Sequence, residues 1–169
     1  MSQQDPQPAG TPPQHDLQPD VAAAHGRPPG TQGDRVSLTI PCRPEYVGVA
    51  RLAVLGIASR MPLSYDEIED VRLAVGEACT HAVERAGDTP ATIQITSDIS
   101  PQALVIEVAD DVAEGTSPAA PSEDAKLLEE AGVDQQGLGA LLMEILVDKV
   151  QIEAGPAGTR VRLTKYAPE

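Results

Sequence analysis

Two titratable side chains stand four residues apart in the stretch RLAVGEACTHAVERAG, which covers residues 72–87. On a helix this spacing places Glu77 and His81 on one face, with Leu73 one turn earlier. Such a pair either forms the wall of a site or is a half-buried Glu–His pair on a packing helix. Taken alone, the stretch favours the second interpretation.

An acidic pair follows the apolar stretch LVIEV. Asp110 stands where this predicted strand ends, a common place for a side chain that receives a ligand. Acidic residues also form turns at strand ends, and Asp111 beside it leaves the choice between the two open.

Two further features have glycine next to a possible phosphate contact. Gly137, Leu138 and Gly139 are predicted to open a helix, where glycines let backbone N–H groups approach an anion and the helix start carries partial positive charge. Thr159 begins a predicted strand, and its hydroxyl could reach a phosphate or cap the turn. Each feature taken singly favours a purely structural role.

Hydrophobic patterns predict the elements that must position these residues. Strands are expected at 35–40, 91–99 and 103–110 and in a terminal hairpin at 150–166, a loop at 111–122, and helices within 41–61, 62–87, 122–132 and 134–149. Hairpin-joined strands with helices in pairs predict a two-layer α/β sandwich. We expect a mixed, mostly antiparallel sheet with all helices on one face.

The first two helices carry clear signals. Pro44 suits a first helical turn, Ser64 and Glu67 form a capping-box pattern, and Gly87 is a plausible stop. The expected apolar positions are Val47, Leu52, Leu55 and Ile57 on the first helix and Ile68, Val71, Val75, Ala78 and Ala82 on the second.

Composition limits the domain organisation and the partners. Residues 1–34 are rich in Pro, Gln and Gly and predict a disordered tail, so that residues 35–169 form the folded domain. The formal net charge of −14 argues against direct binding of nucleic acid or an anionic membrane. The two cysteines make no disulfide framework, and no signal peptide or membrane span is recognised, so a cytoplasmic location is expected.

Taken together, the motifs resemble those of a known family. RPEYVGVARLAVLGIA, RLAVGEACTHAVERA, VIEVAD, QGLGALLMEILVDKV and GTRVRLTK occur in the order found in the anti-sigma-factor serine/threonine protein kinases, which belong to the histidine-kinase-like GHKL ATPase superfamily. The resemblance covers residues 35–166. It implies a GHKL (Bergerat-type) fold, ATP and Mg²⁺ as cofactors, a sigma factor and an anti-anti-sigma (STAS-type) protein as partners, and a homodimer.

The resemblance also implies roles for individual residues. Glu77 matches the helix glutamate proposed as general base, and Asp110 matches the aspartate that accepts a hydrogen bond from the adenine amino group. Gly137, Leu138 and Gly139 match the second glycine box, which cradles phosphates. Thr159 matches a hydroxyl near the adenine pocket.

Two departures from the family pattern predict a weakened nucleotide site. His81 stands where the family has its magnesium-binding asparagine, and imidazole suits Mg²⁺ poorly. Val112 and Glu114 replace the two glycines that follow the aspartate, which should disfavour close approach of ATP. Gly115 would compensate if the loop were shifted by one residue.

Three hypotheses follow from these observations. The first is an anti-sigma regulatory protein with a degenerate ATP site. The second is an active serine protein kinase in which His81 and water hold the metal in place of the asparagine. The third is an interaction module that no longer binds nucleotide.

Overall fold

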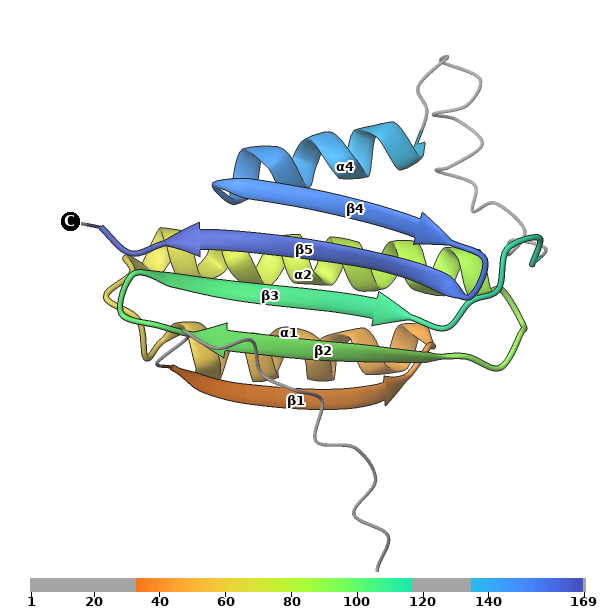
Figure 1. Ribbon diagram of the computed structural model, residues 1–169, viewed down its shortest axis with the longest axis horizontal. Coiled ribbons are helices and arrows are strands. Elements are labelled where there is room, and N and C mark those ends of the chain that lie inside the picture. The colour runs from red at the N-terminus through yellow and green to blue at the C-terminus, as the bar shows by residue number, and fades with distance from the viewer. Residues whose placement is uncertain (1–32, 117–134, 169) are drawn as a thin grey trace, which may run out of the picture. The chain divides into compact units, whose positions relative to one another are not determined.

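The computed structural model describes residues 33–116 and 135–168. Along the chain its elements are β1 (Asp34–Pro41), α1 (Pro44–Ala58), α2 (Tyr65–Ala86), β2 (Thr92–Ile99), β3 (Ala103–Asp110), α4 (Gln135–Leu146), β4 (Lys149–Gly155) and β5 (Gly158–Tyr166). The strands form one five-stranded sheet in the order β1-β2-β3-β5-β4, and helices α1 and α2 lie behind it in Figure 1. The predicted two-layer α/β class is confirmed.

In detail, the sheet is antiparallel at each of its strand pairings and is not mixed. The reason lies in the terminal hairpin. Its second strand, β5, pairs with β3, and β4 pairs only with β5 at the sheet edge. Strand β4 therefore runs in the same direction as β3 without touching it, because β5 lies between them.

Helix α2 has the ends that its sequence predicts. The Ser64 hydroxyl accepts a hydrogen bond from the Glu67 N–H at 3.2 Å, and the Ser64 N–H donates to the Glu67 carboxylate at 2.8 Å. Gly87 closes the helix with φ of 55°, a conformation that favours glycine. These two caps fix where the helix begins and ends.

The buried face of α1 differs from the expected one. Leu52 is 70% exposed, while the buried residues of this helix are Val47, Ala50, Val54 and Ala58. All four follow one helical spacing of three and four residues, and two of them are alanines. The sequence pattern gave the large Leu52 more weight than these small residues. Alanines suffice here because α1 packs closely against α2.

The core lies between the sheet and the helices and is aliphatic. Its largest fully buried side chains include Ile93, Leu104, Ile106, Met143 and Leu163, which come from three strands and α4. Within the described residues, no helix is long and apolar enough to cross a membrane. The predicted tail, except for Gly33 and Asp34, and the predicted helix at 122–132 lie outside the described residues.

Candidate functional site

Asp110 points into the domain at the end of β3. Alternate residues of this strand, Leu104, Ile106 and Val108, face the core, and Asp110 continues the same phase. Its side chain is only 4% exposed. A carboxylate at this depth must be hydrogen-bonded or paired, so its partners define the local chemistry.

Asp111 has a different role, which removes the ambiguity between the two acids. Its carboxylate accepts hydrogen bonds from the Thr92 N–H at 2.6 Å and from the Thr92 hydroxyl at 2.9 Å. The residue is exposed and ties the end of β3 to the start of β2. Asp111 is therefore a connection within the fold, and Asp110 is the candidate for ligand contact.

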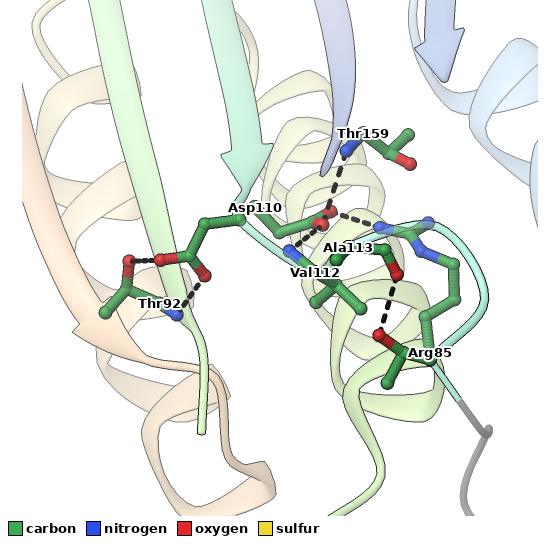
Figure 2. A network of polar contacts seen from close by, with 8 residues as sticks. Arg85, Thr92, Asp110, Val112, Ala113 and Thr159 are labelled. Atoms are coloured by element: carbon green, nitrogen blue, oxygen red, sulfur yellow. Dashed lines mark hydrogen bonds and ion pairs between the residues drawn. The ribbon is translucent and has the colours of Figure 1, made fainter. Parts of the chain in front are cut away.

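Three donors surround the Asp110 carboxylate, as Figure 2 shows. The N–H groups of Val112 and Thr159 donate to Oδ1 at 3.1 and 3.3 Å. Arg85 of α2 forms an ion pair with Oδ2. Arg85 was not singled out from the sequence, although it continues the four-residue spacing of Glu77 and His81 along the helix.

The start of β5 comes very close to the end of β3. A methyl group added at Gly158 would be 1.9 Å from the Asp110 carbonyl oxygen, and the φ of this glycine is 143°. Glycine is required here because any side chain would collide with that backbone. The close approach brings Thr159 to Asp110 through its backbone N–H, a contact that the sequence did not predict.

A cavity of about 350 Å³ lies beside this cluster. It is lined by Arg85, the loop after β3 and the β4–β5 hairpin, with residues Val112, Ala113, Glu114, Gly115, Thr116, Ala154, Gly155 and Thr159. Val112 itself is 6% exposed and belongs to the core, so its side chain anchors the loop. Gly115 has a φ of 83° and shapes the turn in the loop.

Glu77 and His81 form the expected pair on α2. Nε2 of His81 lies 3.0 Å from Oε1 of Glu77, with side-chain exposures of 15% and 27% respectively. The hydrogen bond from His81 lowers the pKa of Glu77, and the charge of Arg51 acts in the same direction, while burial opposes both. Arg51 reaches this region from α1, lying against Gly76.

Gly139 of α4 packs against the Glu77–His81 pair. A methyl group added there would be 2.0 Å from His81 Nε2 and 2.7 Å from Glu77 Oε1. Helix α4 begins at Gln135, so residues 137–139 lie in its first turns. The sequence pattern had predicted them at the opening of the helix. Gly137 and Leu138 are exposed, whereas Gly139 is buried at the contact between α4 and α2.

The site residues therefore form two groups along α2. One group contains Glu77, His81 and Gly139, and the other contains Arg85 and Asp110. Residues 77 and 85 are about 12 Å apart along the helix axis, at a rise of 1.5 Å per residue. The structure thus brings the candidate residues to one side of α2, but as two separate clusters.

Neither cluster is arranged to receive the group that the family pattern implies. His81 Nε2 faces Glu77 and the backbone of Gly139. Asp110 is buried with Arg85 against it. The residues present do not fit Mg²⁺ at His81 or an adenine amino group at Asp110 without rearrangement.

Comparison with known families agrees with the fold and the motifs. The family described as histidine kinase-like ATPase domain matches residues 40–165. The chain therefore belongs to the histidine kinase-like ATPase domain family.

Relatives within this family are bacterial proteins named serine-protein kinase RsbW. The protein from Bacillus licheniformis is 38% identical over 143 residues, covering 79% of this chain and 86% of the relative. The one from Bacillus subtilis (strain 168) is 39% identical over 146 residues, with the same coverage. The chain is thus similar to RsbW over nearly the whole of its described part.

A solved structure supports the fold independently. The crystal structure of the RsbU and RsbW domains of a Mycobacterium tuberculosis protein matches with a TM-score of 0.59 and 17% sequence identity. The match covers 80% of this chain and 33% of the chain in that crystal structure.

Proposed function

We propose that this chain is an anti-sigma regulatory protein with a degenerate ATP site. It sequesters a sigma factor in the cytoplasm and is countered by an anti-anti-sigma (STAS-type) partner. Support for the regulatory class comes from the motif order and from 38% identity to a protein named serine-protein kinase RsbW. The observation that carries the degenerate site is that Asp110 and Glu77 are each engaged by a side chain of the protein itself.

The cluster of Asp110 and Arg85, called here the adenine-side cluster, has a carboxylate that is already hydrogen-bonded. Asp110 accepts from two backbone N–H groups and from Arg85. A base amino group must compete with a charged donor, and hydrogen bonds from charged groups are stronger than neutral ones. Binding of adenine at this position is therefore weak.

At the other cluster, the obstacle is the metal. Mg²⁺ prefers octahedral oxygen ligands, and His81 offers only a ring nitrogen that already faces Glu77. Without a metal on the phosphates, phosphoryl transfer lacks its main charge neutralisation. This arrangement supports sequestration of a partner over catalysis.

The second candidate function is an active serine protein kinase. Two observations favour it: the relatives are named as such, and the Glu77 side chain is 27% exposed, so that an attacking hydroxyl can reach its carboxylate. The third candidate is an interaction module that binds no nucleotide. The pairing of Asp110 with Arg85 supports it as it supports the first candidate.

Charge and composition suggest how the partners are engaged. A net charge of −14 suits a basic segment of a sigma factor, because opposite charge steers association. In this proposal the domain of residues 35–169 binds its partners as a homodimer.

Affinity capture tests the regulatory function. Full-length tagged protein is incubated with extract of the source bacterium and with purified candidate partners. Recovery of a sigma factor, and its release by an anti-anti-sigma protein, is the expected result. Recovery of neither would overturn the proposal.

Calorimetric titration with ATP, with and without Mg²⁺, separates the candidates. The degenerate site predicts weak binding with little dependence on Mg²⁺. Tight Mg²⁺-dependent binding, together with phosphate transfer to the anti-anti-sigma partner that is lost in Glu77→Ala, would establish the kinase instead. No binding up to millimolar ATP would favour the interaction module.

A further inference from the structure

We infer that Arg85 is an internal occupant of the adenine-side cluster: its guanidinium takes the place on Asp110 that a base amino group would take, and it sets how tightly the site accepts an adenine nucleoside. The inference rests on the proposed function, since it assigns the base end of the same site to Asp110.

The donors around Asp110 are not equivalent. The N–H groups of Val112 and Thr159 belong to the backbone, and Thr159 is held in place by the pairing of β5 with its neighbours. Arg85 is a side chain of α2, and it is 31% exposed, whereas Asp110 is 4% exposed. Of the three donors, Arg85 is the one that can leave without moving the backbone.

Chemistry makes the guanidinium a substitute for the base. An adenine amino group offers N–H donors in a plane, and a guanidinium offers the same kind of donors with a positive charge added. Oδ2 of Asp110, which Arg85 contacts, is the oxygen that the two backbone donors leave open. A base that binds Asp110 must therefore compete for that oxygen.

The cavity beside the cluster provides room for the exchange. Arg85 lines this space of about 350 Å³, and so does Glu114 of the loop after β3. A displaced guanidinium would find a second carboxylate there without leaving the cavity. Glu114, which departs from the family's glycine pattern, thereby becomes the alternative partner of Arg85.

The role of Arg85 at Asp110, the base end of the site, can be tested separately from the metal end at Glu77 and His81. Arg85 lies two turns of α2 away from Glu77, so its effect should be present with a nucleoside that has no phosphates. Adenosine in the presence of EDTA probes Asp110 and Arg85 alone, whereas ATP with Mg²⁺ probes both clusters.

The test is calorimetric titration of the full chain with adenosine in EDTA. We expect Arg85→Met to bind adenosine about tenfold more tightly than the unmodified protein, because one competing charge-assisted hydrogen bond is removed. Arg72→Met is the matched control: Arg72 is on the same helix and pairs with Glu69 outside the site, so its affinity should stay unchanged. Adding Asp110→Ala to Arg85→Met should abolish the gain.

An Arg85→Met protein that melts cooperatively but binds adenosine no more tightly would overturn the inference, as would a gain that survives Asp110→Ala. A measurement on the unmodified protein covers the case in which the variant does not fold. With excess adenosine, the NMR signal of the Arg85 Nε–H should move together with the Val112 and Thr159 amide signals. Amide signals that move while the Arg85 signal stays fixed would also overturn it.

Failure of this inference and failure of the proposed function give different results. Capture of the sigma factor depends on neither adenosine nor Arg85, so it tests the regulatory proposal alone. Loss of capture with a tenfold adenosine effect would overturn the function and keep the assignment of Arg85. Capture of the sigma factor without the adenosine effect would keep the proposed function and overturn the assignment of Arg85.

Discussion

The backbone of Gly139 lies directly against the ring of His81. Any side chain at position 139 would place its first carbon 2.0 Å from Nε2 of that ring. Helices α2 and α4 therefore meet at the position where the family pattern expects a metal ligand. The contact explains why a glycine is needed at 139 without invoking a phosphate.

The first prediction concerns this contact. Gly139→Ala should destabilise the domain by about 1–3 kcal/mol, because the added methyl group forces His81 off Glu77. Gly48→Ala is the control: it lies in α1 with nothing within 4 Å of an added methyl group, and should stabilise by about 1 kcal/mol. Urea denaturation measures both. The penalty should shrink in the His81→Ala background, and equal penalties in both backgrounds would contradict the steric account.

A second prediction concerns pH. The hydrogen bond from His81 lowers the pKa of Glu77, so the folded state holds this carboxylate ionised more strongly than the unfolded chain does. This contribution to stability is present above the unfolded-state pKa of a glutamate and is lost as pH falls through the lower folded-state pKa. In His81→Ala the pKa of Glu77 should rise. Carbon-detected NMR titration of the Glu77 carboxyl checks this, and identical titration curves would rule it out.

The third prediction separates the two neighbouring acids. Asp110→Ala leaves Arg85 and two backbone N–H groups without their acceptor, and should cost about 2 kcal/mol or more. Asp111→Ala breaks only exposed hydrogen bonds to Thr92 and should cost about 1 kcal/mol. Chemical denaturation of both variants tests the order, and a larger loss for Asp111→Ala would reverse the assignment of roles.

The fourth prediction concerns the thiols. Burial raises the pKa of Cys42 to about 11 and that of Cys79 to about 12, so both are protonated at neutral pH. Ellman's reagent should react with neither in the folded protein and with both in urea. Stability should fall as pH rises above the unfolded-state thiol pKa, because only the unfolded chain then releases these protons. Rapid labelling of native protein at neutral pH would contradict the burial of the thiols.

Local interactions made several elements predictable from the sequence. The capping box of Ser64 and Glu67 and the stop at Gly87 involve residues within one helix, so their pattern sufficed. The strand phase that points Asp110 inward is also a property of a single strand, but the sequence analysis left the choice between Asp110 and Asp111 open. The burial of small residues was harder to predict. The alanines of α1 are buried in the core, where Leu52 was expected.

The sequence by itself thus determined the fold class, the motif order and the placement of Glu77 and His81 on one face of α2. Only the tertiary structure decided the partners of the candidate residues. In the tertiary structure Thr92 hydrogen-bonds to Asp111, Arg85 pairs with Asp110, and Gly139 packs against His81. Each of these contacts joins residues far apart in the chain, and spacing along one element carries no information about which element packs beside it. Whether a charged side chain meets a ligand or another residue of the same protein is decided by that packing.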